Sequence, residues 1–158
     1  MPATVRRLAL TLTTVLAAAA ITSGCDTVEP AATITKQQAV ERVANRAQEA
    51  LRQLPPGATL QVRLHEPDTP CDPGDPRTFV ESNYSLDYPE QWPVEQAIPT
   101  LAAYWRDKGY KIIKDQRDRP KTPALSVEDP DGFRIGVALT YRDSGRIDAF
   151  LISSSPCL

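Results

Sequence analysis

The most reactive side chains in this 158-residue sequence are three cysteines and one histidine. Cys25 follows a run of small residues, Cys71 lies in a proline-rich stretch, and Cys157 is the penultimate residue. A thiol can carry a lipid, pair with a second thiol, or act as a nucleophile beside a base. Because His65 is the only histidine, the sequence offers few candidates for base-assisted catalysis.

An apolar segment before Cys25 has the order of a secretory signal peptide. Arg6 and Arg7 form a positive start, and the uncharged stretch 8–21 follows. A membrane-spanning helix needs about 20 apolar residues, so this stretch is short for a span. Its length and flanks fit a signal peptide, which we predict over residues 1–24.

The residues directly before Cys25 make that prediction more specific. Ser23, Gly24 and Cys25 resemble the last three positions of a bacterial lipoprotein signal (the lipobox), although Thr22 stands where leucine is usual. The resemblance implies diacylglycerol on the Cys25 sulfur, cleavage before Cys25, and a lipid anchor at the extracytoplasmic face of the cell membrane. Two or more acyl chains anchor stably, since each buried CH₂ contributes about 0.8 kcal/mol. The alternatives are a plain secreted protein and an uncleaved anchor, in both of which Cys25 would be incidental.

Cys71 and Cys157 remain once Cys25 is assigned to the lipid. An even number of cysteines in an oxidising compartment favours a disulfide. We therefore predict a Cys71–Cys157 disulfide, which would close a loop of about 85 residues and contribute roughly 4–5 kcal/mol in the chain-entropy model. The alternative is a pair of free buried thiols.

Polar residues around the only histidine suggest a metal or acid–base site. Zinc, however, usually takes three or four ligands at recognised spacings, and the sequence has no second histidine to join His65. Acidic extracellular loops can bind calcium, and four acids crowd this region: Glu66, Asp68, Asp72 and Asp75. We favour a solvated acidic loop and predict no metal and no other cofactor.

Five aromatic residues in the middle of the sequence form the best candidate for a binding surface. They are Tyr84, Tyr88, Trp92, Tyr104 and Trp105. Aromatic side chains can line a pocket for an apolar or sugar ligand. Tyrosine and tryptophan also commonly bridge core and surface, and core packing is the favoured interpretation of this group.

Charge narrows the classes of partner. Residues 25–158 carry 16 basic and 20 acidic side chains, a formal charge of −4. Nucleic-acid binding relies on a net basic face, so this balance argues against it. The sequence contains no nucleophile elbow, P-loop, dinucleotide fingerprint or metalloprotease helix.

Hydrophobic periodicity predicts two helices and six strands. The first helix begins at Thr35, where Gln38 completes a capping box, and it stops at residues 55–57. The second opens at residues 92–93, and Pro99 must bend it or delay its start. Strands are expected over residues 60–64, 79–88, 110–114, 124–128, 133–141 and 147–153.

The order helix, two strands, helix, four strands predicts an α+β fold, a two-layer sandwich with both helices on one face of a mainly antiparallel sheet. The chain then divides into a signal peptide (1–24), a lipid-attached tether (25–34) and one α+β domain (35–158). Residues 65–77 contain four prolines and are expected to form an irregular loop. The strand at 147–153 is apolar at successive positions, which suggests a central strand covered on both faces, or a bulge.

Four motifs in the predicted domain resemble a group of small actinobacterial lipoproteins without an assigned activity. The motifs are Pro-Cys-Asp at 70–72, Tyr-Trp-x-x-x-Gly-Tyr at 104–110, Pro-Asp-Gly-Phe at 130–133 and Ser-Pro-Cys at 155–157. The resemblance covers most of residues 35–158. It supports the disulfide and implies no particular chemistry.

The sequence therefore predicts a membrane-anchored extracytoplasmic lipoprotein with a non-enzymatic binding or accessory role in the cell envelope. Its partner would be an envelope protein or a small apolar ligand. One alternative is a carrier that holds an apolar molecule in a pocket between helices and sheet. A second alternative is a hydrolase with an unrecognised site. The second face of the predicted sheet is polar enough to meet solvent or a partner, and it carries Arg134, Gly136, Ala138, Thr140 and Arg142.

Overall fold

The computed structural model describes residues 34–158. The predicted signal peptide and Cys25 lie outside the described residues, as does most of the predicted tether. The described chain runs helix, two strands, helix, four strands, which confirms the predicted α+β order. Its elements are α1 (Lys36–Leu51), β1 (Thr59–Pro70), β2 (Thr78–Asp87), a 3-10 turn η1 (Val94–Gln96), α2 (Ala97–Asp107), β3 (Lys111–Asp115), β4 (Ala124–Glu128), β5 (Arg134–Tyr141) and β6 (Ile147–Ser154).

The first helix, α1, begins at the predicted capping box. Thr35 Oγ1 accepts a hydrogen bond from the Gln38 amide at 3.2 Å, and Gln38 Oε1 accepts one from the Thr35 amide at 2.9 Å. Two amides at the start of the helix are thereby satisfied. The fully buried residues of α1 form one stripe of small side chains: Ala39, Val43, Ala47 and Ala50.

Pro99 delays the start of α2, which was one of the two predicted outcomes. The chain first forms the 3-10 turn η1, and the α-helix starts only at Ala97, so Pro99 lies in its first turn. A proline is tolerated there because first-turn amides have no acceptor within the helix. Gly109 ends the helix with a φ of +76°, and its amide donates to the Arg106 carbonyl at 2.9 Å.

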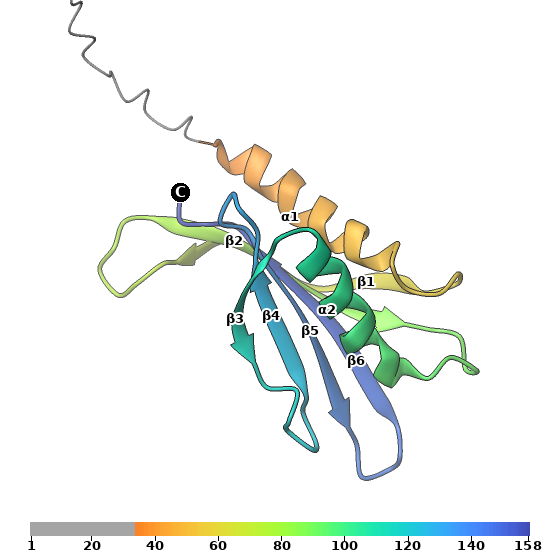
Figure 1. Cartoon of the computed structure of the whole chain (residues 1–158). Helices are drawn as coiled ribbons and strands as arrows, with labels where there is room; N and C mark the ends of the chain where they lie inside the picture. Colours follow the sequence, from red (N-terminus) through yellow and green to blue (C-terminus); the bar gives the residue numbers. More distant parts are fainter. Residues whose placement is uncertain (1–33) are drawn as a thin grey trace, which may run out of the picture. The chain divides into compact units, whose positions relative to one another are not determined.

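The six strands form one antiparallel sheet in the order β1-β2-β6-β5-β4-β3. Both helices cover the same face of this sheet (Figure 1). The first helix contacts β1, β2 and β6, whereas α2 contacts β4 and β5. This arrangement confirms the predicted two-layer architecture.

The hydrophobic core fills the layer between the helices and the sheet. Its largest fully buried side chains in the main cluster are Trp105, Leu101, Leu125, Ile135, Leu139 and Leu151. A second cluster lies under the first half of α1 and consists of Ala39, Val43, Val80 and Phe133.

The expectation of an irregular loop over residues 65–77 is wrong for its first half, because β1 continues to Pro70. Proline has no amide hydrogen to donate. β1 is an edge strand whose only neighbour is β2, so a residue whose backbone points away from β2 needs no amide hydrogen for strand pairing. The pairing with β2 also shifts register next to Pro67, and such a bulge accommodates an unpaired residue. Only residues 71–77 connect the two strands.

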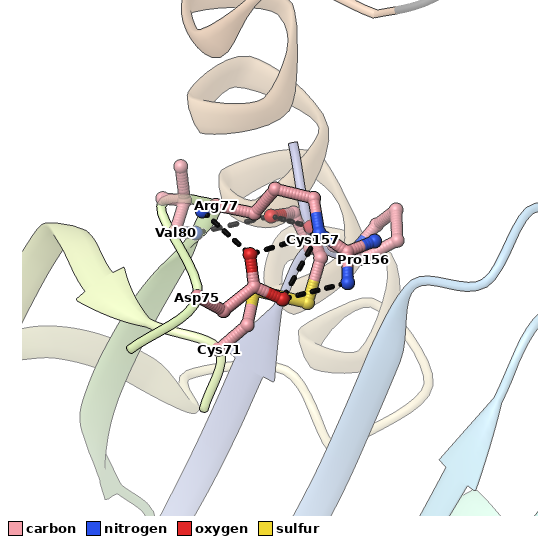
Figure 2. The surroundings of a disulfide bond; sticks show 7 residues. Cys71, Asp75, Arg77, Val80, Pro156 and Cys157 are labelled. Atoms are coloured by element: carbon pink, nitrogen blue, oxygen red, sulfur yellow. Dashed lines mark hydrogen bonds and ion pairs between the residues drawn. A yellow bond between two sulfur atoms is a disulfide. The ribbon is translucent and has the colours of Figure 1, made fainter. Parts of the chain in front are cut away.

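Cys71 and Cys157 form the predicted disulfide, with Cα atoms 6.1 Å apart and a separation of 86 residues along the chain. The bond joins the β1–β2 connection to the segment after β6 (Figure 2). The Cys71 amide donates to the Arg77 carbonyl at 3.1 Å, and the Arg77 guanidinium donates to Asp75 at 2.7 Å. The disulfide thus closes one end of the sheet.

Removing the disulfide should destabilise the domain. Closing an 86-residue loop contributes roughly 4–5 kcal/mol in the chain-entropy model, so the double variant Cys71→Ser/Cys157→Ser should lose up to about that free energy of unfolding. Urea denaturation of both proteins measures the difference. Peptide mapping without reductant should recover a Cys71–Cys157 peptide from the parent, and two alkylatable thiols would contradict the crosslink.

A buried carboxylate ties α1 to the turn between β4 and β5. The Asp129 side chain is 1% exposed and accepts hydrogen bonds from the amides of Asp131 and Phe133, both at 2.9 Å. Arg46 of α1 approaches the same carboxylate through Nε at 2.7 Å and Nη2 at 2.6 Å. Burial lowers the pKa of Arg46, but the hydrogen bond and charge of Asp129 more than offset this, so the pKa is raised.

Asp129→Ala should cost about 3–5 kcal/mol of unfolding free energy, because it leaves a partly buried guanidinium and two amides without their acceptor. Asp129→Asn should cost less, since its carbonyl oxygen can still accept from the turn amides. Asp143→Ala is the matched control: its carboxylate is 93% exposed and pairs only with Lys121, so the loss should be at most about 1 kcal/mol. Equal urea midpoints for Asp129→Ala and Asp143→Ala would contradict the assignment.

Candidate functional site

The second face of the sheet, called the open face here, carries no helix within residues 34–158 (Figure 1). Side chains alternate between faces along a strand, so Asp148, Phe150 and Ile152 of β6 point to the open face. The sequence correctly predicted that β6 is central, since it lies between β2 and β5. Covering on both faces is wrong for the described residues, because Ile152 is 41% exposed.

Small residues surround the two apolar side chains of β6 on the open face. Across from Phe150 and Ile152 on β5 lie Ala138 and Gly136, and Ser126 of β4 lies opposite Gly136. A Cβ atom at Gly136 would lie 2.7 Å from Ser126 Oγ, so glycine lets β4 and β5 come together at this point. The side chains of β4 and β5 beside Phe150 and Ile152 are therefore short, and they leave these two apolar side chains accessible.

A hollow of about 580 Å³ opens at one end of the open face, beside the turn between β5 and β6. Its floor is a row of neighbours across β1, β2 and β6: Gln61, Ser85 and Phe150. Its charged lining consists of three arginines and three acids: Arg63, Arg142, Arg146, Asp87, Glu90 and Asp148. The formal charge of this lining is therefore zero at neutral pH.

Two arginines hold the carboxylate of Asp148 in place. Arg142 Nε lies 2.6 Å from one carboxylate oxygen of Asp148, and Arg146 Nε lies 2.8 Å from the other. The Asp148 side chain is 15% exposed, whereas those of Arg142 and Arg146 are mostly exposed. The hydrogen bond from Arg142 and the pairing with Arg146 lower the pKa of Asp148, so it remains ionised as a fixed acceptor in the hollow.

Arg63 joins the lining at an irregularity in β1. The pairing with β2 shifts register between Val62 and Leu64, so Arg63 has no partner across the strands. A bulge of this kind changes the direction of a side chain. Within the described part of the chain, neither Arg63 nor Glu90 has an ion-pair partner, so both charges remain available to a ligand.

Tyr88 lines the hollow and also contacts Ile147 and Trp92. Its hydroxyl donates to the Ile147 carbonyl at 2.8 Å, and its ring meets Trp92 edge to face with centroids 6.1 Å apart. Burial raises the pKa of Tyr88, and the negative charges of Glu95 and Asp148 add to this. The residue is thus a neutral, fixed wall of the hollow.

The five aromatic residues predicted as a binding surface occupy different environments. Tyr84 and Trp105 belong to the core and are 6% and 1% exposed. Tyr88 lines the hollow and contacts Trp92, while Tyr104 on α2 lies under the Lys108 ammonium. Of the five, only Tyr88 lines the hollow on the open face.

Two of the four acids around His65 pair with separate cations. Asp68 pairs with Lys36, and Asp75 pairs with Arg77 at 2.7 Å. Among residues 34–158, no group of three or more His, Cys, Asp or Glu side chains is placed to hold a metal ion. His65 Nδ1 instead lies 2.8 Å from the Ser82 hydroxyl.

Sequence reasoning placed Arg142 on the second face of the sheet but missed the other five charged residues of the hollow. A local signal was present, because Arg142, Arg146 and Asp148 flank the tight turn at Asp143-Ser144-Gly145 and must lie close together. No local signal could place Arg63 beside them, because that depends on the order of strands in the sheet.

No family model, curated protein or solved structure matches this chain. Within residues 34–158, no helix has the length and apolar character needed to cross a membrane. A proposal about function therefore depends on the chain's own residues, above all on the open face.

We expect Asp148 to titrate below the usual aspartate pKa of about 3.9, because its charged form is stabilised by Arg142 and then by Arg146. The stability that this pairing contributes is present above pH ~4 and is lost as pH falls through the lowered pKa, where the carboxyl becomes neutral. Arg142→Ala should raise the pKa toward the usual value. Carboxyl NMR titration measures it, with Arg106→Ala on α2 as control; a parent pKa at or above the usual value would contradict the assignment.

Proposed function

We propose that this protein is a membrane-anchored extracytoplasmic lipoprotein that binds a cell-envelope partner through the open face of its sheet and catalyses no reaction. The observation that carries the binding role is the asymmetry of the sheet. The middle of its inner face is packed against the two helices, while its outer face carries no helix within the described residues and presents Phe150 and Ile152 beside a charged hollow. Apolar surface rimmed by polar groups is typical of binding sites.

The packing of the core favours a surface site over an internal carrier. A carrier needs volume between the helices and the sheet. In that layer Trp105 and Leu101 are at most 1% exposed and belong to one continuous cluster. The two hollows described on residues 34–158 lie elsewhere, one on the open face and one at Asp115, Arg117 and Asp118.

The only serine–histidine contact in the described residues gives little support to a hydrolase. The Ser82 hydroxyl lies 2.8 Å from His65 Nδ1, but Ser82 is only 3% exposed and lies in the middle of β2. A nucleophile must reach the substrate carbonyl, with hydrogen-bond donors for the developing oxyanion nearby. The contact therefore fits a hydrogen bond that satisfies a buried hydroxyl.

The proposed anchor limits where a partner can be found. About ten residues separate the lipid on Cys25 from the domain, and an extended chain spans at most ~3.3–3.6 Å per residue. The domain would therefore stand no more than about 35 Å from the membrane surface. Because the mature chain has a formal charge of −4, general attraction to anionic lipid headgroups is not expected to add to the anchor.

Labelling and crosslinking in cells test the two halves of this proposal. Radiolabelled fatty acid should enter the parent protein and should be absent from Cys25→Ala. A photoreactive amino acid at Ala138, on the open face, should give adducts of discrete mass in the anchored protein. The matched control is Ala44, which is exposed on the outer surface of α1.

Each half has its own contradicting result. Fatty acid that persists on Cys25→Ala would remove the anchor from the proposal. Adducts from Ala44 but not from Ala138 would show that the helical surface, and not the open face, meets the partner.

A further inference from the structure

We propose that the charged hollow on the open face binds a neutral, polyhydroxylated ligand, a short segment of saccharide. This inference rests on the proposed function of the open face and names the chemistry of its ligand. It is argued from the charge balance of the lining, from the hydrogen-bonding capacity of its side chains, and from the floor on which a ligand would lie.

The balance of charge excludes two simpler ligand classes. An anion would need a net positive lining, but three arginines face three acids here. An apolar molecule would need a mostly apolar lining. Here six of the thirteen lining residues are ionised, and the aliphatic or phenyl ones are Leu86, Ile147, Ala149 and Phe150. A net-neutral and strongly polar lining matches a ligand that is itself neutral and polar.

Saccharide hydroxyls match this lining group by group. Each hydroxyl donates one hydrogen bond and accepts others. Guanidinium groups only donate, and carboxylates only accept, so neighbouring hydroxyls can be held by the two kinds of side chain together. The Asp148 carboxylate is already fixed by Arg142 and Arg146 at 2.6 and 2.8 Å, so this part of the lining is arranged before a ligand arrives.

Three charges without an ion-pair partner supply the remaining contacts. Among the described residues these are Arg63, Asp87 and Glu90, and the Asp87 carboxylate accepts a hydrogen bond from the Gln61 side chain. Arg63 stands at the bulge of β1, where its guanidinium can donate to a ligand without breaking an existing pair. The ring of Phe150 forms part of the floor, and its apolar surface suits the C–H face of a sugar ring.

The test uses residues 32–158, a compact unit with its own core and disulfide. The ¹⁵N-labelled protein is titrated with four neutral probes, maltotriose, cellotriose, mannotriose and N,N′,N″-triacetylchitotriose, and with two comparators, glucose 6-phosphate and the zwitterion alanyl-alanine. At least one neutral probe should shift the amide signals of Ser85 and Phe150. Arg63→Ala should weaken that binding by roughly tenfold, the effect of losing a hydrogen bond from a charged donor.

Arg106→Ala is the matched control, because it removes a similar charge from the exposed side of α2 and should leave binding unchanged. Failure of all four neutral probes to shift these signals would overturn the saccharide assignment, as would binding that Arg63→Ala leaves intact. If a comparator alone shifts them, the saccharide class fails while the open face remains a binding site. If no probe acts there and Ala138 also gives no adducts in cells, the proposed function fails as well.

Discussion

The whole sheet depends on the insertion of β6 between β2 and β5. The β1–β2 hairpin and the β3–β4–β5 meander share no strand pairing, and each is joined to the other only through β6. Ile152, for example, lies opposite Asn83 on one side and opposite Gly136 on the other. β5 and β6 form a local hairpin, so the two halves of the sheet join through the β2–β6 pairing, whose long sequence separation carries a loop-closure cost in entropy. The disulfide at one end of β6 and the Arg46–Asp129 pair offset part of that cost by linking distant segments.

The same strand order creates the hollow and explains why the sequence did not reveal it. Alternation of apolar residues predicted five of the six strands within two residues at each end, because that signal is local. The hollow requires Gln61, Ser85 and Phe150 to become neighbours across β1, β2 and β6. This neighbourhood follows from strand order, which local patterns do not encode. The aromatic group failed to mark the site because Tyr84 and Tyr88 share the same alternation: Tyr84 lies in the middle of β2 and is buried, whereas Tyr88 follows the end of β2 at Asp87 and lines the hollow.

The sequence predicted structure best where the backbone hydrogen bonds of a short segment are satisfied by side chains of the same segment. Thr35 and Gln38 marked the start of α1 because both capping bonds form within four residues. The loop predicted for the proline-rich residues 65–77 was wrong in its first half for the opposite reason. Proline is excluded from a central strand but tolerated at an edge, and edge position is a property of the completed sheet. The prolines of β1 also limit pairing of that edge with other chains, so this segment protects the fold at a place where the sequence suggested a loop.

The position of the hollow on the sheet bears on how an anchored domain would use it. Ile34, where the described chain begins, packs against the cluster formed by Val80 and Phe133 at the disulfide end of the sheet. Asp148 and the hollow lie at the other end of β6, six residues from Ser154, which corresponds to about 20 Å of extended strand. If Cys25 carries the lipid, the chain enters the domain at the end remote from the hollow. The charged lining would then be free to meet envelope polymer, because the entry point of the tether does not compete for the same surface.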